Sequence, residues 1–268
     1  MTGSQEVRRA TRDTIHQRCR AVGAVAREFG TPLPHWWHVA LLPVGSTLET
    51  RPLGTAAGHT FRIAVDLVGG TARVANPVAV IEYSIGVPTS EFVEWLMAAC
   101  SDQGAAIVLD PGDFAAPDVF DTAQAAAIAG MFDATAGTLR RFAEEIGGDQ
   151  SPVQVWPHHF DMALTWFSGR RVPDIEDHDD EAAAEQITVG FSTGDESVAD
   201  PYVYATAYPQ PDDLTGEALP PPGRWTTAQD GFAGAILAHA DAVATGDPGE
   251  AILRFLGAYF AEASRRMT

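Results

Sequence analysis

The stretch TFRIAVDLV, residues 60–68, alternates apolar and polar side chains for most of its length, as a β-strand with one buried face does. The pair Gly69-Gly70 follows it and suits a tight hairpin turn into TARVAN, and VAVIEYSI comes next. No helical pattern separates these three stretches. Strands joined by short turns pair antiparallel, so this region predicts an antiparallel meander.

Helical patterns flank the predicted strands in both halves of the sequence. Helices are predicted over 5–29, 91–102 and 121–146, from apolar spacing and from capping and glycine stop signals. Further strands are predicted at VQVWPHHFDMALTWF, EQITVGFSTG and YVYATAY, and two final helices at 227–241 and 249–265. Because the strands occur in runs and do not alternate with helices, the predicted fold class is α+β, with antiparallel β-meanders packed with helices.

Two octets resemble each other across the sequence. PHWWHVAL at 34–41 and PHHFDMAL at 157–164 share proline, histidine, alanine and leucine at equivalent positions. The helix endings AREFG and AEEIG also match. Together with the order of elements, these likenesses predict two pseudo-symmetric helix–meander–helix halves, residues 1–118 and 119–268, within one compact globular unit. The alternative is a coincidence between two ordinary strands.

The octets supply the predicted catalytic residues. If both are strands, Trp36 and His38 share one face of the first, and His159 and Asp161 share one face of the second. Strands related by a pseudo-twofold axis would bring His38 and Asp161 to a common cavity, as a histidine–carboxylate pair able to transfer protons. His38 and Asp161 are therefore predicted to be catalytic, and Trp36 and His159 to bind ligand.

Each of these residues also has a structural interpretation. His38 lies between two apolar residues and can be a hydrogen-bonded structural histidine. Asp161 lies in an apolar stretch, where an ionised carboxylate needs a definite partner, and that partner can be a loop amide or Arg170.

The stretch YVYATAY at 202–208 places Tyr202, Tyr204 and Tyr208 on one face of a strand. Such a row of tyrosines is usual on a half-buried sheet face, where the hydroxyl groups reach water or a backbone partner. It can also line a ligand pocket. The three tyrosines are therefore predicted ligand-binding residues.

Histidine and aspartate are also ligand types of catalytic zinc sites. A metal-dependent enzyme that uses His38, His159 and Asp161 is therefore one alternative. The spacing of these residues matches no recognised metal motif, so the sequence assigns no metal ligand and identifies no cofactor.

Charge limits the expected partners. The chain has 36 acidic and 17 basic residues, all of the latter arginine, for a formal net charge of −19. Such a field repels nucleic-acid phosphates and anionic lipid, and no stretch approaches the roughly 20 apolar residues that span a bilayer. We expect a small-molecule ligand and a homodimer, and neither nucleic acid nor membrane. Two cysteines and the absence of a signal-peptide pattern predict the cytoplasm.

Four strings together carry a family resemblance: HWWHV (35–39), FRIAVDLV (61–68), WPHHFDMALTWFSGRR (156–171) and DPYVYATAYP (200–209). With them the chain resembles an uncharacterised bacterial family of unknown function, family 5996, over nearly its whole length. The resemblance implies no established reaction, cofactor or catalytic residue. It also implies that the doublet His158-His159 varies within the family.

The residues thus favour a protein that binds a small molecule in a pocket lined by histidine, aspartate and tyrosine, with acid–base catalysis as a further possibility. A non-catalytic interaction module that docks a partner through Trp36, Tyr202 and Tyr208 is the alternative from another class. The metal-dependent enzyme is the third.

Overall fold

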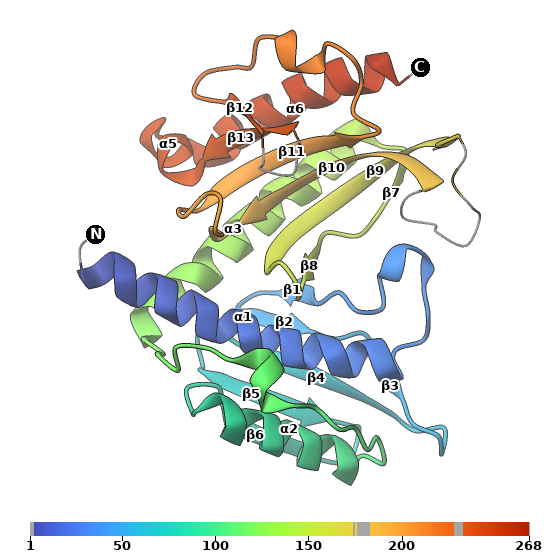
Figure 1. The fold of residues 1–268 in the computed structure, drawn as a ribbon, viewed down its shortest axis with the longest axis vertical. Helices are drawn as coiled ribbons and strands as arrows, with labels where there is room; N and C mark the ends of the chain where they lie inside the picture. Colours follow the sequence, from blue (N-terminus) through green and yellow to red (C-terminus); the bar gives the residue numbers. More distant parts are fainter. Residues whose placement is uncertain (1–2, 174, 176–182, 228–232, 268) are drawn as a thin grey trace. The chain divides into compact units, whose positions relative to one another are not determined.

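The computed structural model describes residues 3–173, 175, 183–227 and 233–267. Within these ranges the chain has five α-helices and two antiparallel sheets (Figure 1), which confirms the predicted α+β class. Contacts divide the chain into two compact units: Met1–Asp133 with Gln154–Phe160, and Ala134–Val153 with Asp161–Thr268. The pseudo-symmetry of residues 1–118 and 119–268 stays a prediction.

The first unit contains the predicted meander. Its antiparallel sheet has the order β1-β2-β4-β5-β6, and β3 pairs with β4. The hairpin between β4 and β5 pairs Asp66 with Thr71 around the glycine pair, and Ile63 and Val65 face the core. The strands are β1 (Leu42–Val44), β2 (Thr47–Glu49), β3 (Leu53–Gly54), β4 (Thr60–Asp66), β5 (Thr71–Ala75) and β6 (Val80–Ser84).

Helices of the first unit follow the predicted patterns. Helix α1 (Gly3–Phe29) ends just before Gly30 and buries one face that includes Ile15 and Val22. Helix α2 (Thr89–Asp102) begins directly after Pro88. The remaining elements are the 3₁₀ turns η1 (Pro34–Trp36) and η2 (Pro111–Phe114) and the short strand β8 (Gln154–Trp156). Helix α3 (Thr122–Ile146) starts in this unit and continues into the second.

The second unit is built on an antiparallel sheet with the strand order β12-β13-β11-β10-β9-β7. Its strands are β7 (Asp149–Gln150), β9 (Asp161–Arg171), β10 (Ala184–Ser192), β11 (Tyr202–Tyr208), β12 (Arg224–Thr227) and β13 (Ala233–Ala238). Helix α6 (Pro248–Arg266) contacts β10, β11 and β13, and the short helices α5 (His239–Ala244) and η3 (Leu214–Gly216) complete the unit. No helix among the described residues combines the length and the apolar composition that a membrane crossing requires.

The predicted helix over 227–241 is wrong for most of its length. Residues 233–238, AGAILA, form β13, which pairs with β11 and β12, and α5 begins only at His239. Residues 228–232 lie outside the described part. A six-residue apolar run fits a buried strand and a helix equally well by periodicity, so pairing with neighbouring strands decides its conformation.

The prediction that both octets are strands is also wrong. Pro34–Trp36 form a 3₁₀ turn in which His35 and Trp36 have φ of 52° and 58°. In the second octet, a turn continues to Phe160, where φ is 55°, and β9 begins only at Asp161. A left-handed backbone cannot continue a strand, and proline supplies no N–H for a sheet. The shared strand faces inferred for Trp36 with His38 and for His159 with Asp161 therefore do not exist.

One buried arginine joins three segments of the first unit. The side chain of Arg18, on α1, has no solvent exposure. It donates hydrogen bonds to the carbonyl of Val87 at 2.7 Å, to Oγ1 of Thr89 at 2.8 Å and to Oδ1 of Asp118 at 3.2 Å. The same carboxylate oxygen accepts the backbone N–H of Thr89 at 2.9 Å. This network fixes the first turn of α2 and the loop at Asp118 to α1.

We expect Arg18→Met to destabilise the protein by about 3 kcal/mol, because removal of a buried donor leaves its acceptors unpaired. The measurement is urea unfolding followed by circular dichroism. Arg73→Met is the matched control, since Arg73 and Glu82 are 3.8 Å apart and largely exposed, and such pairs contribute less than about 1 kcal/mol. Equal losses for the two variants would show that the Arg18 network does not stabilise the fold.

Candidate functional site

His38, a predicted catalytic residue, has a structural role in the first unit. Its side chain is buried, and its Nδ1 accepts the backbone N–H of Leu33 at 3.2 Å. The ring stacks on Trp36 with centroids 5.5 Å apart. Burial lowers the pKa of His38, and the nearby guanidinium groups of Arg51 and Arg27 lower it further. The imidazole is therefore held neutral as a hydrogen-bond acceptor that fixes the loop before the first octet.

Arg51 holds the first octet in place. It donates to the carbonyl oxygens of Trp37 at 2.5 Å and Ala40 at 3.3 Å, and to Oε1 of Gln154 at 3.0 Å. Leu41 and Val155 also exchange two backbone hydrogen bonds of 2.8 Å. The first octet therefore lies beside β8, the strand that precedes the second octet.

Trp36, a predicted ligand-binding residue, is the large aromatic side chain at the tip of this loop. Its exposed fraction is 49 %, and the guanidinium of Arg27 lies 5.3 Å from its ring centroid. A cation–π contact at an exposed site contributes about 0.5–1 kcal/mol, so it orients the ring without burying it.

Histidines gather at the turn of the second octet. His158 and His159, the predicted ligand residue, are exposed, and their ring centroids are 4.2 Å apart. Nε2 of His16, on α1, lies 3.1 Å from the carbonyl oxygen of His158. Burial, His159, His16 and Arg20 lower the pKa of His158 to about 4. His158 is therefore a neutral imidazole at neutral pH, and burial lowers the pKa of His16 as well.

The second unit brings the remaining predicted residues together on one face of its sheet. Strand registers place Asp161 opposite Ser192 and Ser192 opposite Tyr202, while Ala163, Gly190 and Tyr204 form the next row. Residues that pair directly in a sheet point to the same side. The burial of β11 confirms the predicted alternation, because Val203, Ala205 and Ala207 are buried and the tyrosines face the other way. We call this side the polar face; it comprises Asp161, Thr165, Gln186, Thr188, Ser192, Tyr202, Tyr204, Thr206 and Tyr208.

Tyr204 donates a hydrogen bond from its hydroxyl group to Oδ2 of Asp161. Tyr204 lies on β11 and Asp161 on β9, so the phenol ring crosses β10 to reach the carboxylate. This contact supplies a definite partner for Asp161, as predicted. Arg170 instead pairs with Glu185, with Nη2 and Oε2 2.7 Å apart.

Gly190 makes this crossing possible. A Cβ atom at residue 190 would lie 2.5 Å from Cζ and Oη of Tyr204 and 2.5 Å from the carbonyl oxygen of Met162. Any side chain there would occupy the space that the phenol ring uses. Gly190 therefore positions Tyr204, although it has no polar side chain of its own.

A second tyrosine–aspartate pair lies beside the first. The hydroxyl group of Tyr202 donates to Oδ2 of Asp195, whose Oδ1 accepts the N–H groups of Ser197 at 2.7 Å and Val198 at 2.8 Å. The rings of Tyr202 and Tyr204 are 6.2 Å apart between centroids. Asp195 thus fixes both the phenol and the loop that leads into β11.

Both phenols remain protonated at neutral pH. Burial raises the pKa of Tyr204 well above its ordinary value, and the negative charge of Asp161 raises it further. Burial and Asp195 raise the pKa of Tyr202 in the same way. Asp161 on the polar face and Asp195 in the loop before β11 are thus each oriented by a neutral phenol. Tyr208, the third predicted tyrosine, lies at the far end of the strand with an exposed fraction of 38 %.

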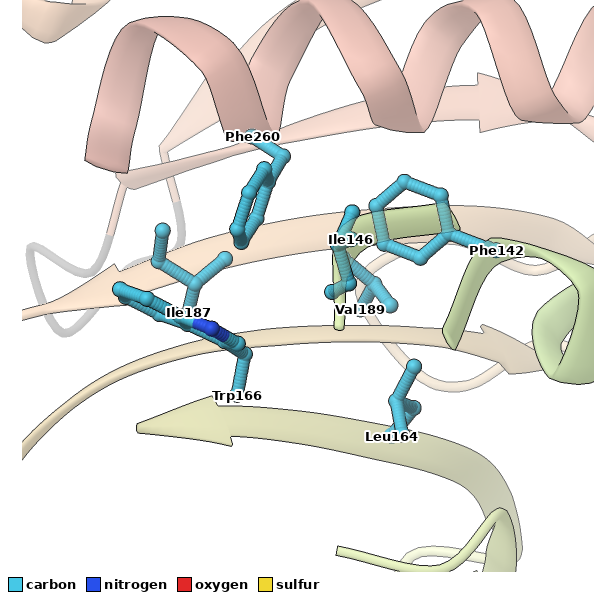
Figure 2. Close-up of a pocket in the computed structure, with 7 residues that line it drawn as sticks. All are labelled: Phe142, Ile146, Leu164, Trp166, Ile187, Val189 and Phe260. Carbon is cyan, nitrogen blue, oxygen red and sulfur yellow. The ribbon is translucent and has the colours of Figure 1, made fainter. Parts of the chain in front are cut away.

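The opposite face of the sheet is apolar and packs against helices. Figure 2 shows Phe142 and Ile146 of α3 and Phe260 of α6 pointing toward Leu164, Trp166, Ile187 and Val189 of the strands. The rings of Trp166 and Phe260 meet edge to face at 5.1 Å. The hollow between these side chains has no room for a water molecule. It is therefore core packing, and the polar side chains of the strands lie on the other side of the sheet.

The predicted pairing of His38 with Asp161 stays a prediction, because the two residues belong to different units. In the described ranges, no group of three or more histidine, cysteine, aspartate and glutamate side chains could hold a metal ion. The metal-dependent alternative likewise stays a prediction.

Sequence reasoning missed Gly190, Asp195 and Arg51. A glycine inside a strand pattern signals a close approach of another group, and GFSTG carried that signal at Gly190. The sequence signal for Asp195 is weaker: an aspartate that follows a glycine often caps a turn. Arg51 had none, since two of its partners are backbone carbonyls, which any sequence supplies, and the third is Gln154, far away in the sequence.

We expect Gly190→Ala to destabilise the protein by about 1–3 kcal/mol, because the added methyl group overlaps the ring of Tyr204. The variant should also lower the pKa of Tyr204, measured by NMR of the tyrosine Cζ resonances, since the ring moves from Asp161. Gly137→Ala is the control: residue 137 is exposed on α3 with nothing near its Cβ position, so alanine should stabilise it slightly. An unchanged Tyr204 resonance in Gly190→Ala would contradict the crossing.

We expect His158→Gln to shift acid unfolding to lower pH. The pKa of His158 in the folded protein is about 4, below the ordinary value of 6.5. The unfolded chain therefore binds more protons in this window, and the folded protein loses stability as pH falls from 6.5 toward 4. Glutamine removes this titration. The measurement is the acid midpoint by circular dichroism, with the exposed His59→Gln as control, and coincident midpoints for all three proteins would refute the prediction.

Comparison with families of known sequences matches residues 4–268 to a family of unknown function, DUF5996. Comparison with curated proteins gives no match, and neither does comparison with solved structures. The match extends over nearly the whole chain and confirms the resemblance carried by the four strings. The chain therefore belongs to the family of unknown function DUF5996.

Proposed function

We propose that this protein binds a small molecule at the polar face of its second unit, with Asp161, Tyr202 and Tyr204 as the binding residues. The observation that carries the proposal is the hydrogen bond from Tyr204 to Asp161, made across a strand that has glycine at the crossing. A sheet face that is only solvated does not require a side-chain contact that crosses a strand. An oriented carboxylate is the usual means of fixing a polar ligand.

The chemistry of the polar face favours a ligand with hydrogen-bond donors. Asp161 and Asp195 accept hydrogen bonds, and the two phenols that orient them are neutral. The rings of Tyr202 and Tyr204 add aromatic surface, which attracts cations. An amine or amidinium group satisfies both features. We therefore propose a small organic cation as the preferred ligand.

If a reaction takes place, Asp161 is the proton acceptor. Tyr204 positions that carboxylate and does not act as a base near neutral pH, because its pKa is raised. His38 is left out of this role, since its Nδ1 is already the acceptor for Leu33.

A non-catalytic interaction module is supported by the exposed rings of Trp36 and Tyr208, which belong to different units. Isolated exposed aromatic side chains are ordinary on a protein surface and do not make a docking patch. The hydrogen bond from Tyr204 to Asp161 on the polar face therefore favours the small-molecule proposal over the interaction module.

The test is a thermal-shift screen of the full chain with small amines, amidines, carboxylates and amides. Compounds that raise the melting temperature of the wild type should lose their effect in Asp161→Asn and Tyr204→Phe. A ligand present at 100 times its dissociation constant stabilises the folded protein by about 2.7 kcal/mol, and a thermal-shift screen detects a change of this size.

Tyr83→Phe and Glu91→Gln are matched controls, because Tyr83 donates to Glu91 in a third phenol–carboxylate pair, on an exposed surface of the first unit. Ligand effects should persist in both controls. A screen without hits, or hits that stabilise all variants alike, would refute the proposed site. Loss of stability in Tyr204→Phe without any change in ligand response would show that the pair is only structural.

A further inference from the structure

Four basic side chains of the first unit meet at the turn of the second octet. His16 and Arg20 are four residues apart on α1 and therefore project from one side of the helix. His158 and His159 follow Pro157, which packs so closely on α1 that a Cβ atom at residue 23 would lie 2.7 Å from the Cβ of Pro157. Phe160 stacks on His16 at 5.5 Å. The turn is thus fixed against the helix on both sides of the histidine doublet.

Basic groups predominate around His158. The groups that act electrostatically on His158 are His159, His16 and Arg20, without a carboxylate. Asp13 has the smallest effect on His16, and it is itself paired with Arg12 through contacts of 2.5 and 2.8 Å. In a chain with a net charge of −19, a local group of three imidazoles and a guanidinium needs a physical reason.

Several N–H donors of the cluster make no hydrogen bond to the described residues. The rings of His158 and His159 are exposed and make no hydrogen bond within the described part of the chain. Arg20 donates through Nη1 to Oε1 of Gln17 at 2.7 Å and to the carbonyl of Asp113 at 3.1 Å. Its Nε and Nη2 make no hydrogen bond to the described residues. A planar guanidinium with two remaining donors suits a tetrahedral oxyanion.

We propose that His16, Arg20, His158 and His159 form a binding site for the phosphate or sulfate group of a small molecule. A cation would be repelled by Arg20, and a polyanion such as nucleic acid would be repelled by the charge of the whole chain. A small dianion is attracted by Arg20 and is repelled by the charge of the whole chain far less than a polyanion is. This inference goes beyond the ligand proposed for the polar face and uses none of the residues assigned there.

Binding at this site takes up protons. A bound dianion favours the protonated imidazoles, so affinity rises as the pH falls toward the range in which histidine titrates. The ionisable groups that face the cluster are Asp13 and Arg20 of α1, the two histidines of the turn, and Asp113 of η2, whose carbonyl accepts from Arg20. Sulfate remains a dianion throughout this range, so its pH dependence reports the protein alone.

The test is titration of the full chain with sulfate, followed by the imidazole resonances in NMR, with sodium chloride at equal ionic strength as reference. We expect saturable shifts of His16, His158 and His159. The dissociation constant should be roughly tenfold smaller at about pH 6 than at about pH 8. Phosphate should bind at the same residues. Shifts that chloride reproduces, or sulfate shifts that do not saturate, would overturn the proposal. The titration of the wild type is sufficient for this decision.

Variants then assign the site. Arg20→Gln and the double variant His158→Gln/His159→Gln should each weaken sulfate binding by roughly tenfold, or about 1.4 kcal/mol. His59→Gln, which removes an exposed imidazole elsewhere in the first unit, should leave binding unchanged. Sulfate binding that survives the double variant would overturn the assignment. Neither result bears on the thermal-shift screen, because that screen concerns Asp161 and Tyr204.

Discussion

Asp161 accepts a hydrogen bond from Tyr204 across the strand that lies between them, and this contact depends on the glycine at residue 190. It also depends on the sidedness of the sheet. Phe142, Ile146 and Phe260 cover the apolar face, so the strands can direct their polar side chains the other way. A carboxylate and two phenols then become neighbours without any of them entering the core. The candidate site is therefore a consequence of how this sheet packs against its helices.

The first unit uses buried charge for a different purpose. Arg18 binds backbone carbonyls and Asp118, and Arg51 binds the carbonyls of Trp37 and Ala40. Both guanidinium groups hold irregular segments that have few backbone partners of their own. A planar group with five donors suits this task, because several carbonyls can share one side chain. The conspicuous residues of the first octet thus belong to a fixed loop, and His38 is one of the groups that fix it.

Periodic elements were predictable from the sequence because their signals are repeated. The helix over 5–29 and the meander after residue 60 each combine several apolar positions with a glycine stop or turn. The tyrosine face of β11 followed from parity alone. The run at 233–238 was mistaken for a helix because six apolar residues show no distinguishing period.

Long-range contacts were not predictable in the same way. Nothing in the sequence near Tyr204 indicates that its hydroxyl group reaches Asp161, 43 residues away, or that Gly190 leaves the space for it. The octets misled because their sequences resemble each other, although the first half of each forms a turn in the structure. Prolines and left-handed residues decide that conformation, and the left-handed residues here are not glycine. Side-chain type located the candidate residues, and only the strand register showed which of them meet.

The most direct test of this account is a crystallographic fragment screen of the full chain. The account predicts that fragments with amine or amidine groups bind within hydrogen-bond distance of Asp161, over the rings of Tyr202 and Tyr204. Fragments that bind only elsewhere, or a polar face that the chain's own segments cover completely, would contradict it.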